Sequence, residues 1–296
     1  MRFGLVILPE YTWTAAAPKW RQAETMGFDH AWTFDHVVWG GLPESPWFAA
    51  IPTLTAAACV TDRIRLGTFV SSPNNHHPVQ FMREILALDD ISAGRFILGL
   101  GTGGEPDSTI TGEDLTLGQR VARFHEFTDL LDRLLREDHV DSDGAYYRAR
   151  EVRTLPGPVR RDRPGADTNR VPLVVAANGP KSIRLAVDRG DAWMTYGGAA
   201  ETDDAWWGLI EAGSHVADEA LARAGRERHT LRRYLNLDAK PTFALASAAA
   251  FEDCVGRADR LGFTDVVVPW PRDSEPFRGE LATLEAVAAD VLSRWR

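Results

Sequence analysis

The chain is poor in cysteine, and it contains no long hydrophobic run. Its 296 residues include two cysteines, Cys59 and Cys254, in apolar helix-like stretches without metal-ligand spacing. We therefore expect two buried thiols of a reduced protein and no disulfide. The apolar run at residues 3–8 is too short for the core of a signal peptide, and no later stretch reaches the length of a membrane span. These absences favour a soluble, cytoplasmic protein.

Positive charge is also scarce. The chain has 33 lysine and arginine residues against 42 aspartate and glutamate residues, a formal net charge of −9 at pH 7. Nucleic acid and anionic membrane surfaces are themselves negative and would not attract such a protein. We therefore expect neither as a partner, and a small molecule remains as the expected ligand.

Several catalytic signatures are missing as well. The sequence has no nucleophile elbow with a Ser-His-Asp set, no HExxH, no P-loop and no lysine obviously placed for a Schiff base. His76 and His77 are adjacent, so on an extended loop their side chains would point in opposite directions, and no further ligands are spaced around them. Hydrolase and aldolase chemistry therefore lacks a nucleophile, and we expect no metal.

What the chain does have is a regular alternation of short apolar strands and amphipathic helices. The expected strands are residues 3–8, 30–34, 64–70, 96–100, 173–176, 192–196, 231–237 and 265–268. The expected helices are residues 17–26, 48–60, 79–92, 117–137, 181–189, 203–223, 247–261 and 280–294. Eight strands, each followed by a helix, is the count of a (β/α)8 TIM barrel, and we expect one such α/β domain over residues 1–296.

Residues 138–172 break this rhythm. A hairpin with an Asp143-Gly144 turn is followed by a loop rich in proline and arginine, which we interpret as an inserted excursion. It could serve as a lid, as a dimer contact or simply as surface. The cluster of Arg160, Arg161 and Arg163 is expected to be solvated, with a clamp for an anionic tail as the alternative.

Titratable residues follow two of the expected strands. In a parallel barrel the carboxyl ends of the strands form the active-site mouth. Asp35 and His36 follow the second strand, and Glu105 follows the fourth strand after the turn Gly101–Gly104. An imidazole and a carboxyl group that converge from different strands suit acid/base catalysis. The alternatives are that His36 and Asp35 satisfy loop hydrogen bonds and that the glycines form only a tight turn.

Two later loops suggest a phosphate cradle. Asn178-Gly179-Pro180 stands directly before a helix, and a helix N-terminus with a flexible glycine binds anions readily. Thr195, Gly197 and Gly198 follow the next strand and would complete the cradle. The alternative is that Asn178 only caps its helix.

Ten tryptophans are many for this length. Trp13, Trp39 and Trp270 fall, with Trp47, in loops after expected strands. This placement predicts an aromatic-walled mouth for a flat or apolar ligand.

The segments that carry these features resemble the bacterial luciferase-like monooxygenase superfamily. The matching segments are GFDHAWTFDHVV (27–38), residues 62–103, GAYYRAR (144–150), residues 174–198 and LGFTDVVVPW (261–270). One branch of the superfamily uses FMN with oxygen, and another uses coenzyme F420, a deazaflavin that carries hydride. The Asp35-His36 pair and the turn GTGGE (101–105) resemble the F420 branch.

The resemblance implies an F420-dependent oxidoreductase that forms a homodimer. It assigns substrate proton transfer to His36 and, with less support, to Glu105, because relatives often read GTGE whereas Gly104 is an extra residue here. It also implies a non-prolyl cis peptide at Thr68–Phe69, behind the deazaflavin ring. The implied cofactor-binding residues are Asp35, Thr68, Phe69, Thr102, Gly103, Asn178, Gly179, Thr195, Gly197 and Gly198.

Two other functions stay open from the sequence. An FMN-dependent monooxygenase would share the fold and the phosphate cradle, so that only cofactor preference separates it from the F420 enzyme. A barrel that binds a cofactor without catalysis is the second alternative.

Overall fold

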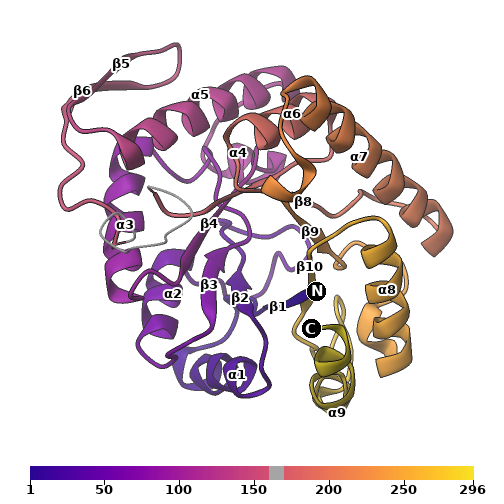
Figure 1. Ribbon diagram of the computed structural model, residues 1–296. Coiled ribbons are helices and arrows are strands. Elements are labelled where there is room, and N and C mark those ends of the chain that lie inside the picture. The colour runs from indigo at the N-terminus through magenta and orange to yellow at the C-terminus, as the bar shows by residue number, and fades with distance from the viewer. Residues whose placement is uncertain (160–169) are drawn as a thin grey trace.

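The computed structural model describes residues 1–159 and 170–296, and within them eight parallel strands close into a barrel (Figure 1). The order around the barrel is β1-β10-β9-β8-β7-β4-β3-β2. The strands are β1 (Arg2–Val6), β2 (His30–Thr33), β3 (Arg65–Thr68), β4 (Phe96–Leu100), β7 (Leu173–Ala176), β8 (Ala192–Thr195), β9 (Arg232–Asn236) and β10 (Asp265–Pro269). The expected TIM barrel and each of its expected strands are confirmed.

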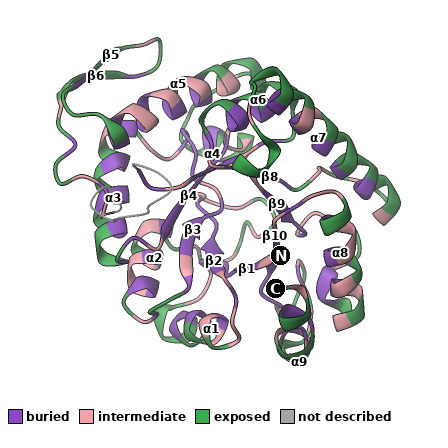
Figure 2. Cartoon of the chain, viewed as in Figure 1, coloured by how far each residue is buried: buried purple, intermediate pink, exposed green. Residues whose placement is uncertain are grey.

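Helices surround the barrel and turn their buried faces towards it (Figure 2). They are α1 (Trp13–Thr25), α2 (Ala50–Ala58), α3 (Pro78–Ile91), α5 (Leu117–Arg136), α6 (Pro180–Arg189), α7 (Asp203–Arg223), α8 (Ala248–Arg260) and α9 (Leu281–Ala286). All of these were expected, whereas the short α4 (Glu105–Ile110) was not. None of the helices in the described part of the chain has the length and hydropathy that a membrane span requires.

Side chains alternate between two cores along the strands, as the period of two in a strand dictates. In β1, Phe3 and Leu5 pack outward against the helices, whereas Val6 belongs to the cluster inside the barrel. The barrel interior is filled by side chains such as Trp32, Ile97, Val174, Tyr234 and Val267. These side chains fill the barrel interior, and a cavity opens above them, where the loops leave the carboxyl ends of the strands.

The expected excursion contains the expected hairpin. β5 (Val140–Asp143) pairs antiparallel with β6 (Arg148–Val152), beside α5 in Figure 1. The carboxylate of Glu126 on α5 accepts hydrogen bonds from the backbone N–H groups of Ala145, Tyr146 and Tyr147 at distances of 2.7 to 3.1 Å. These bonds fix the turn to the barrel. The arginine cluster at 160–163 lies outside the described residues.

Both cysteines are free thiols, but only one of them is buried. Cys254 packs in the core, as expected, and burial raises the pKa of its thiol to about 11. Cys59 is exposed, which corrects the expectation. The reason is its position as the C-terminal cap of α2, off the face on which Ala50, Leu54, Ala57 and Ala58 are buried.

Candidate active site

A cavity of about 1330 Å³ opens at the carboxyl ends of the strands. Loops that follow β2, β3, β4, β7, β8, β9 and β10 line it, so nearly the whole barrel contributes. Its walls are largely apolar, with Phe34, Phe69, Met194 and Phe277 among them. A concave apolar space with a few polar groups is typical of a small-molecule site.

His36 lines this cavity and is held by a carboxylate that the sequence did not suggest. Its Nδ1 lies 2.6 Å from Oδ2 of the buried Asp107, on α4. The other oxygen of Asp107 accepts a hydrogen bond from the backbone N–H of Val37 at 3.0 Å. Because Nδ1 donates its hydrogen bond to this carboxylate, Nε2 is the ring nitrogen left to exchange protons with a ligand.

Glu105 does not meet His36 in the structure. It is the exposed first residue of α4 and is not among the residues that line the cavity. The extra Gly104 is the N-terminal cap of α4, so that the helix presents Asp107, two residues further on, to the imidazole. A signal for this helix was present, because Pro106 and two acidic residues at 105–107 are typical of a first helical turn.

Asp35 lies behind the cavity wall instead of on it. Its carboxylate accepts hydrogen bonds from the hydroxyl of Ser71 at 2.5 Å and from Nε2 of His76 at 2.7 Å. His76 in turn stacks on Phe81 of α3 with ring centroids 3.9 Å apart. Asp35 thus ties the end of β2 to the loop that follows β3. The neighbouring His77 caps α3, accepting the N–H of Val79 at 3.3 Å.

The wall at the end of β3 is a break in the strand ladder. The N–H of Phe69 still bonds to Thr33 on β2 at 2.8 Å, but Ser71 bonds to Gly99 on β4 at 2.9 Å. Between these anchors, Phe69 and Val70 line the cavity, and the non-prolyl cis peptide joins these two residues. It therefore falls one bond beyond the expected Thr68–Phe69. Thr68 itself is buried, and its hydroxyl donates to the Gly99 carbonyl at 2.9 Å.

The glycine turn after β4 forms the next part of the wall. Thr102, Gly103 and Gly104 line the cavity. Gly103 has φ +83°, and a Cβ there would lie 2.5 Å from Nδ2 of Asn74. Nδ2 of Asn74 also donates to the carbonyl of Gly104 at 2.8 Å, so this side chain fixes the backbone of the turn.

The start of α6 offers backbone N–H groups to the cavity. Gly179 is the N-terminal cap and provides no side-chain cap, and a Cβ on it would meet no atom within 4 Å. Asn178, Gly179, Lys181 and Ser182 all line the cavity. Thr195 stands behind them and donates to Oδ1 of Asn178 at 2.7 Å. Gly197 and Gly198 are not among the lining residues, whereas the neighbouring Tyr196 is.

These observations can be set beside known proteins. The model of the luciferase-like monooxygenase family matches residues 1–252 of the chain. The chain belongs to this family.

Two curated members are similar to it over part of their length. An F420-dependent glucose-6-phosphate dehydrogenase of Beutenbergia cavernae is 35% identical over 60% of this chain and 50% of its own length. A 5,10-methylenetetrahydromethanopterin reductase of Archaeoglobus fulgidus is 27% identical over 86% of this chain and 65% of its own. The chain thus spans about half to two thirds of the length of these relatives. The solved coenzyme F420 dependent tetrahydromethanopterin reductase of Methanopyrus kandleri shares the fold, with a TM-score of 0.80 and 19% identity over 100% of this chain and 99% of the other.

The aromatic residues that line the cavity of this chain differ from the expected ones. Trp39 lines the cavity and stacks on Phe277 with ring centroids 5.8 Å apart. Trp13 is partly exposed on α1, and Trp270 is buried beneath Lys19, so neither is among the lining residues. Phe277, which the sequence did not suggest, takes their place because the loop after β10 folds back over the mouth.

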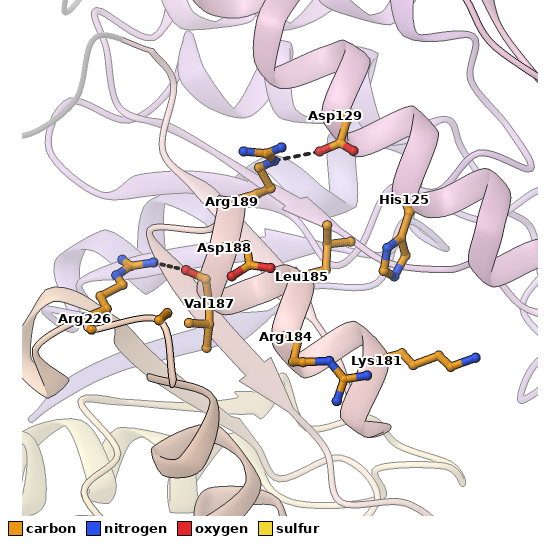
Figure 3. A pocket seen from close by; sticks show the side chains of 11 residues that line it. His125, Asp129, Lys181, Arg184, Leu185, Val187, Asp188, Arg189 and Arg226 are labelled. Atoms are coloured by element: carbon orange, nitrogen blue, oxygen red, sulfur yellow. Dashed lines mark hydrogen bonds and ion pairs between the residues drawn. The ribbon is translucent and has the colours of Figure 1, made fainter. Parts of the chain in front are cut away.

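A second cavity, of about 1000 Å³, lies between α5, α6 and the turn after α7 (Figure 3). At the C-terminal end of α6, Arg189 pairs with Asp129 at 2.6 Å. In the N-terminal half of α6, Lys181 and Arg184 line both this cavity and the active-site cavity. Basic side chains therefore stand where the active-site cavity meets the outer surface.

Proposed function

We propose that the protein is an oxidoreductase that transfers a hydride between coenzyme F420 and a small organic substrate. The observation that carries the proposal is the single cavity where His36, the glycine turn at 101–104 and the uncapped start of α6 meet. The names of the similar proteins, two of which include F420, support this cofactor.

The cavity residues fit a flat cofactor with a phosphate on its tail. Phe69 and Val70 offer an apolar surface against which a ring system can lie. The N–H groups of the first turn of α6 have no side-chain cap, and such groups bind phosphate. Lys181 and Arg184 stand beside this turn and would face the acidic part of the tail. Thr102 and Gly103 would contact the polar edge of the ring.

The residues of the chain would handle the proton that accompanies the hydride. When bound, the deazaflavin supplies the hydride chemistry at carbon 5 of its ring. His36 would take the substrate proton at Nε2 or give it back there, and Asp107 would stabilise the imidazolium that forms. Phe34, Trp39 and Phe277 would exclude water from the reacting atoms.

The second candidate is an FMN-dependent monooxygenase that uses reduced flavin and oxygen. It is favoured by the name of the family, and it would use the same phosphate site. A third candidate, a barrel that binds a cofactor without catalysis, has no specific observation in its favour.

Cofactor preference decides between these candidates. We expect F420 to bind to the apo protein in the micromolar range or tighter and FMN to bind much more weakly, measured by cofactor fluorescence in parallel titrations. Preference for FMN would overturn the proposal and favour the monooxygenase. Binding of neither cofactor would contradict both enzyme functions.

We also propose that the protein is a cytoplasmic homodimer, as the family resemblance implies. Light scattering on the eluting protein would give twice the 32.7 kDa mass of the chain if the proposal holds. A single monomeric species at all concentrations would contradict it.

A further inference from the structure

The end of β9 places a carboxyl group in the active-site cavity. Asn236 and Asp238 line the cavity, whereas the residue between them, Leu237, is fully buried in the outer core. The alternation of side chains along an extended segment explains this placement. Oδ1 of Asn236 accepts the backbone N–H of Asp238 at 3.1 Å, which fixes the direction of the segment.

The barrel order sets Asp238 opposite the wall at the end of β3. Around the closed barrel, β9 is four positions from β3, which is the largest separation among eight strands, and three positions from β2. A flat ring that lies against Phe69 and Val70 would therefore turn its open face towards Asp238. A substrate on that face would lie between the ring and β9, with His36 reaching it from the side.

Asp238 is the only carboxylate among the described residues that line the cavity. The charged or titratable groups that share the cavity are His36, Lys181, Arg184 and Tyr196, and the two cations stand on α6 at the expected phosphate site. Lys240 is near in sequence, but it pairs with Asp203 and donates to the carbonyl of Thr242 at 2.9 Å. The wall beside Asp238 therefore presents negative charge.

Burial raises the pKa of Asp238 to about 6, and hydrogen bonds from the Asn236 side chain and the Ala239 N–H lower it only in part. The carboxyl group is thus mostly ionised at neutral pH and accepts hydrogen bonds without donating any. As the pH falls through about 6, it becomes protonated and loses its charge.

We propose that Asp238 accepts the hydrogen bond of a substrate hydroxyl or ammonium group, so that the enzyme selects uncharged or cationic substrates and rejects anionic ones. This inference rests on the proposed function for the position of the ring. A similar protein is named a dehydrogenase of glucose 6-phosphate, which is an anion. The carboxylate of Asp238 would repel a phosphate ester placed on this side of the cavity, so the present protein has a different class of substrate.

The test uses three probes that share a phenyl ring and differ in charge, benzylamine, benzyl alcohol and benzoate, and the ring suits the aromatic walls. Their binding to the F420-loaded protein is measured by ligand-observed NMR. At neutral pH the wild type is expected to bind the amine and the alcohol and to bind benzoate at least about tenfold more weakly than the amine. Asp238→Asn, which keeps the shape and removes the charge, is expected to weaken benzylamine about tenfold and to strengthen benzoate.

The pH dependence provides a second readout. In the wild type the preference for benzylamine over benzoate should fall as the pH is lowered through about 6, because Asp238 becomes neutral. Any change with pH that remains in Asp238→Asn comes from other groups, so subtracting it isolates the contribution of Asp238. If Asp238 contributed only to folding, Asp238→Asn would change the thermal stability but not the order of the affinities for the three probes.

Three results would overturn the inference: an unchanged preference in Asp238→Asn, benzoate binding to the wild type as tightly as benzylamine, or no binding of any probe. F420 affinity, measured separately by fluorescence, is expected to be the same in both proteins. If F420 does not bind, the proposed function fails on its own, and the same probes applied to the unloaded cavity still decide the charge preference of Asp238.

Discussion

At the scale of single residues, the feature with the greatest consequence is the contact between His36 and Asp107. The imidazole comes from the end of β2 and the carboxylate from α4, 71 residues later, yet their atoms lie 2.6 Å apart. A buried carboxylate on Nδ1 fixes both the tautomer and the orientation of the ring. Asp107 is thus a positioning residue for His36, and the pair should act as one unit.

Replacing His36 by alanine is expected to reduce kcat by about 10²–10⁴-fold, with F420 affinity unchanged. Asp107→Asn should also reduce kcat, though less, because the amide can still accept the Nδ1 hydrogen bond but cannot stabilise the imidazolium by charge. Residues that act as a unit are not additive, so the double variant should lose no more than His36→Ala alone. Steady-state kinetics of all three variants check this, and multiplied losses would show that the two residues act independently.

At the scale of elements, the turn between β4 and α4 is held by side chains from other parts of the chain. Asn74 lies under Gly103 and bonds to Gly104, and Arg123 of α5 donates to Oδ1 of Asn74 at 2.5 Å. Arg123 also pairs with Glu113 at 2.6 Å. These contacts come from the protein itself and hold the turn in one conformation, which reduces the entropy cost of binding.

Gly103→Ala is expected to weaken F420 binding by about tenfold, because a side chain at φ +83° is strained and its Cβ would meet Asn74. Gly118→Ala on α5 is the matched control, since a Cβ there meets no atom within 4 Å. Fluorescence titration gives both affinities, and thermal unfolding shows whether the fold survives. Equal affinities in the two variants would mean that the turn does not contribute to the cofactor site.

At the scale of the whole molecule, the lower end of the barrel contains a buried polar cluster. Nε2 of His30 donates to Asp265 at 3.0 Å, and Trp32 donates its indole N–H to Nδ1 of His30 at 2.6 Å. His30 is therefore neutral, and burial lowers its pKa. Burial alone would raise the pKa of Asp265, but the His30 hydrogen bond and the charge of Arg232 hold it below its ordinary value.

The cluster makes stability fall in acid. The pKa of His30 is lower in the native protein than in the unfolded chain, where it is about 6.5. As the pH falls below this value, the unfolded chain therefore binds a proton at His30 that the native protein does not bind. The lowered pKa of Asp265 acts in the same direction below about pH 4. Urea unfolding at a series of pH values should show stability decreasing from neutral pH downwards. A stability that stays flat between about pH 7 and pH 5 would contradict the assignment of a neutral His30.

Asp265→Asn is expected to cost about 2–3 kcal/mol of unfolding free energy at neutral pH. This is less than the 3–5 kcal/mol typical of a fully buried pair, because Arg232 and Arg2 are partly exposed and can be solvated. Glu219→Gln, which removes the exposed pair with Arg223, should change stability by less than about 1 kcal/mol. Urea unfolding measures both, and equal effects would show that burial adds nothing to the Asp265 pair.

The sequence by itself determined the elements and the end of the barrel where the site lies. Apart from the short α4, the helices of the barrel and its strands were expected from local patterns, mostly apolar runs for strands, apolar spacing for helices and glycine for the turns. Because parallel strands all end at one mouth, a residue such as His36 at a strand end had to lie there. The same logic placed Trp39, Gly103 and Gly179 at the cavity, and the family resemblance placed Phe69 there.

Only the tertiary structure decided which of these residues face the ligand and which support them. Asp35 and Glu105 also stand after strands, yet one is turned into the loop behind the wall and the other is exposed on α4. The partner of His36 is Asp107, and the carboxylate on the cavity wall is Asp238. Such contacts join segments far apart in the chain and depend on loop paths and side-chain directions, which local periodicity does not encode.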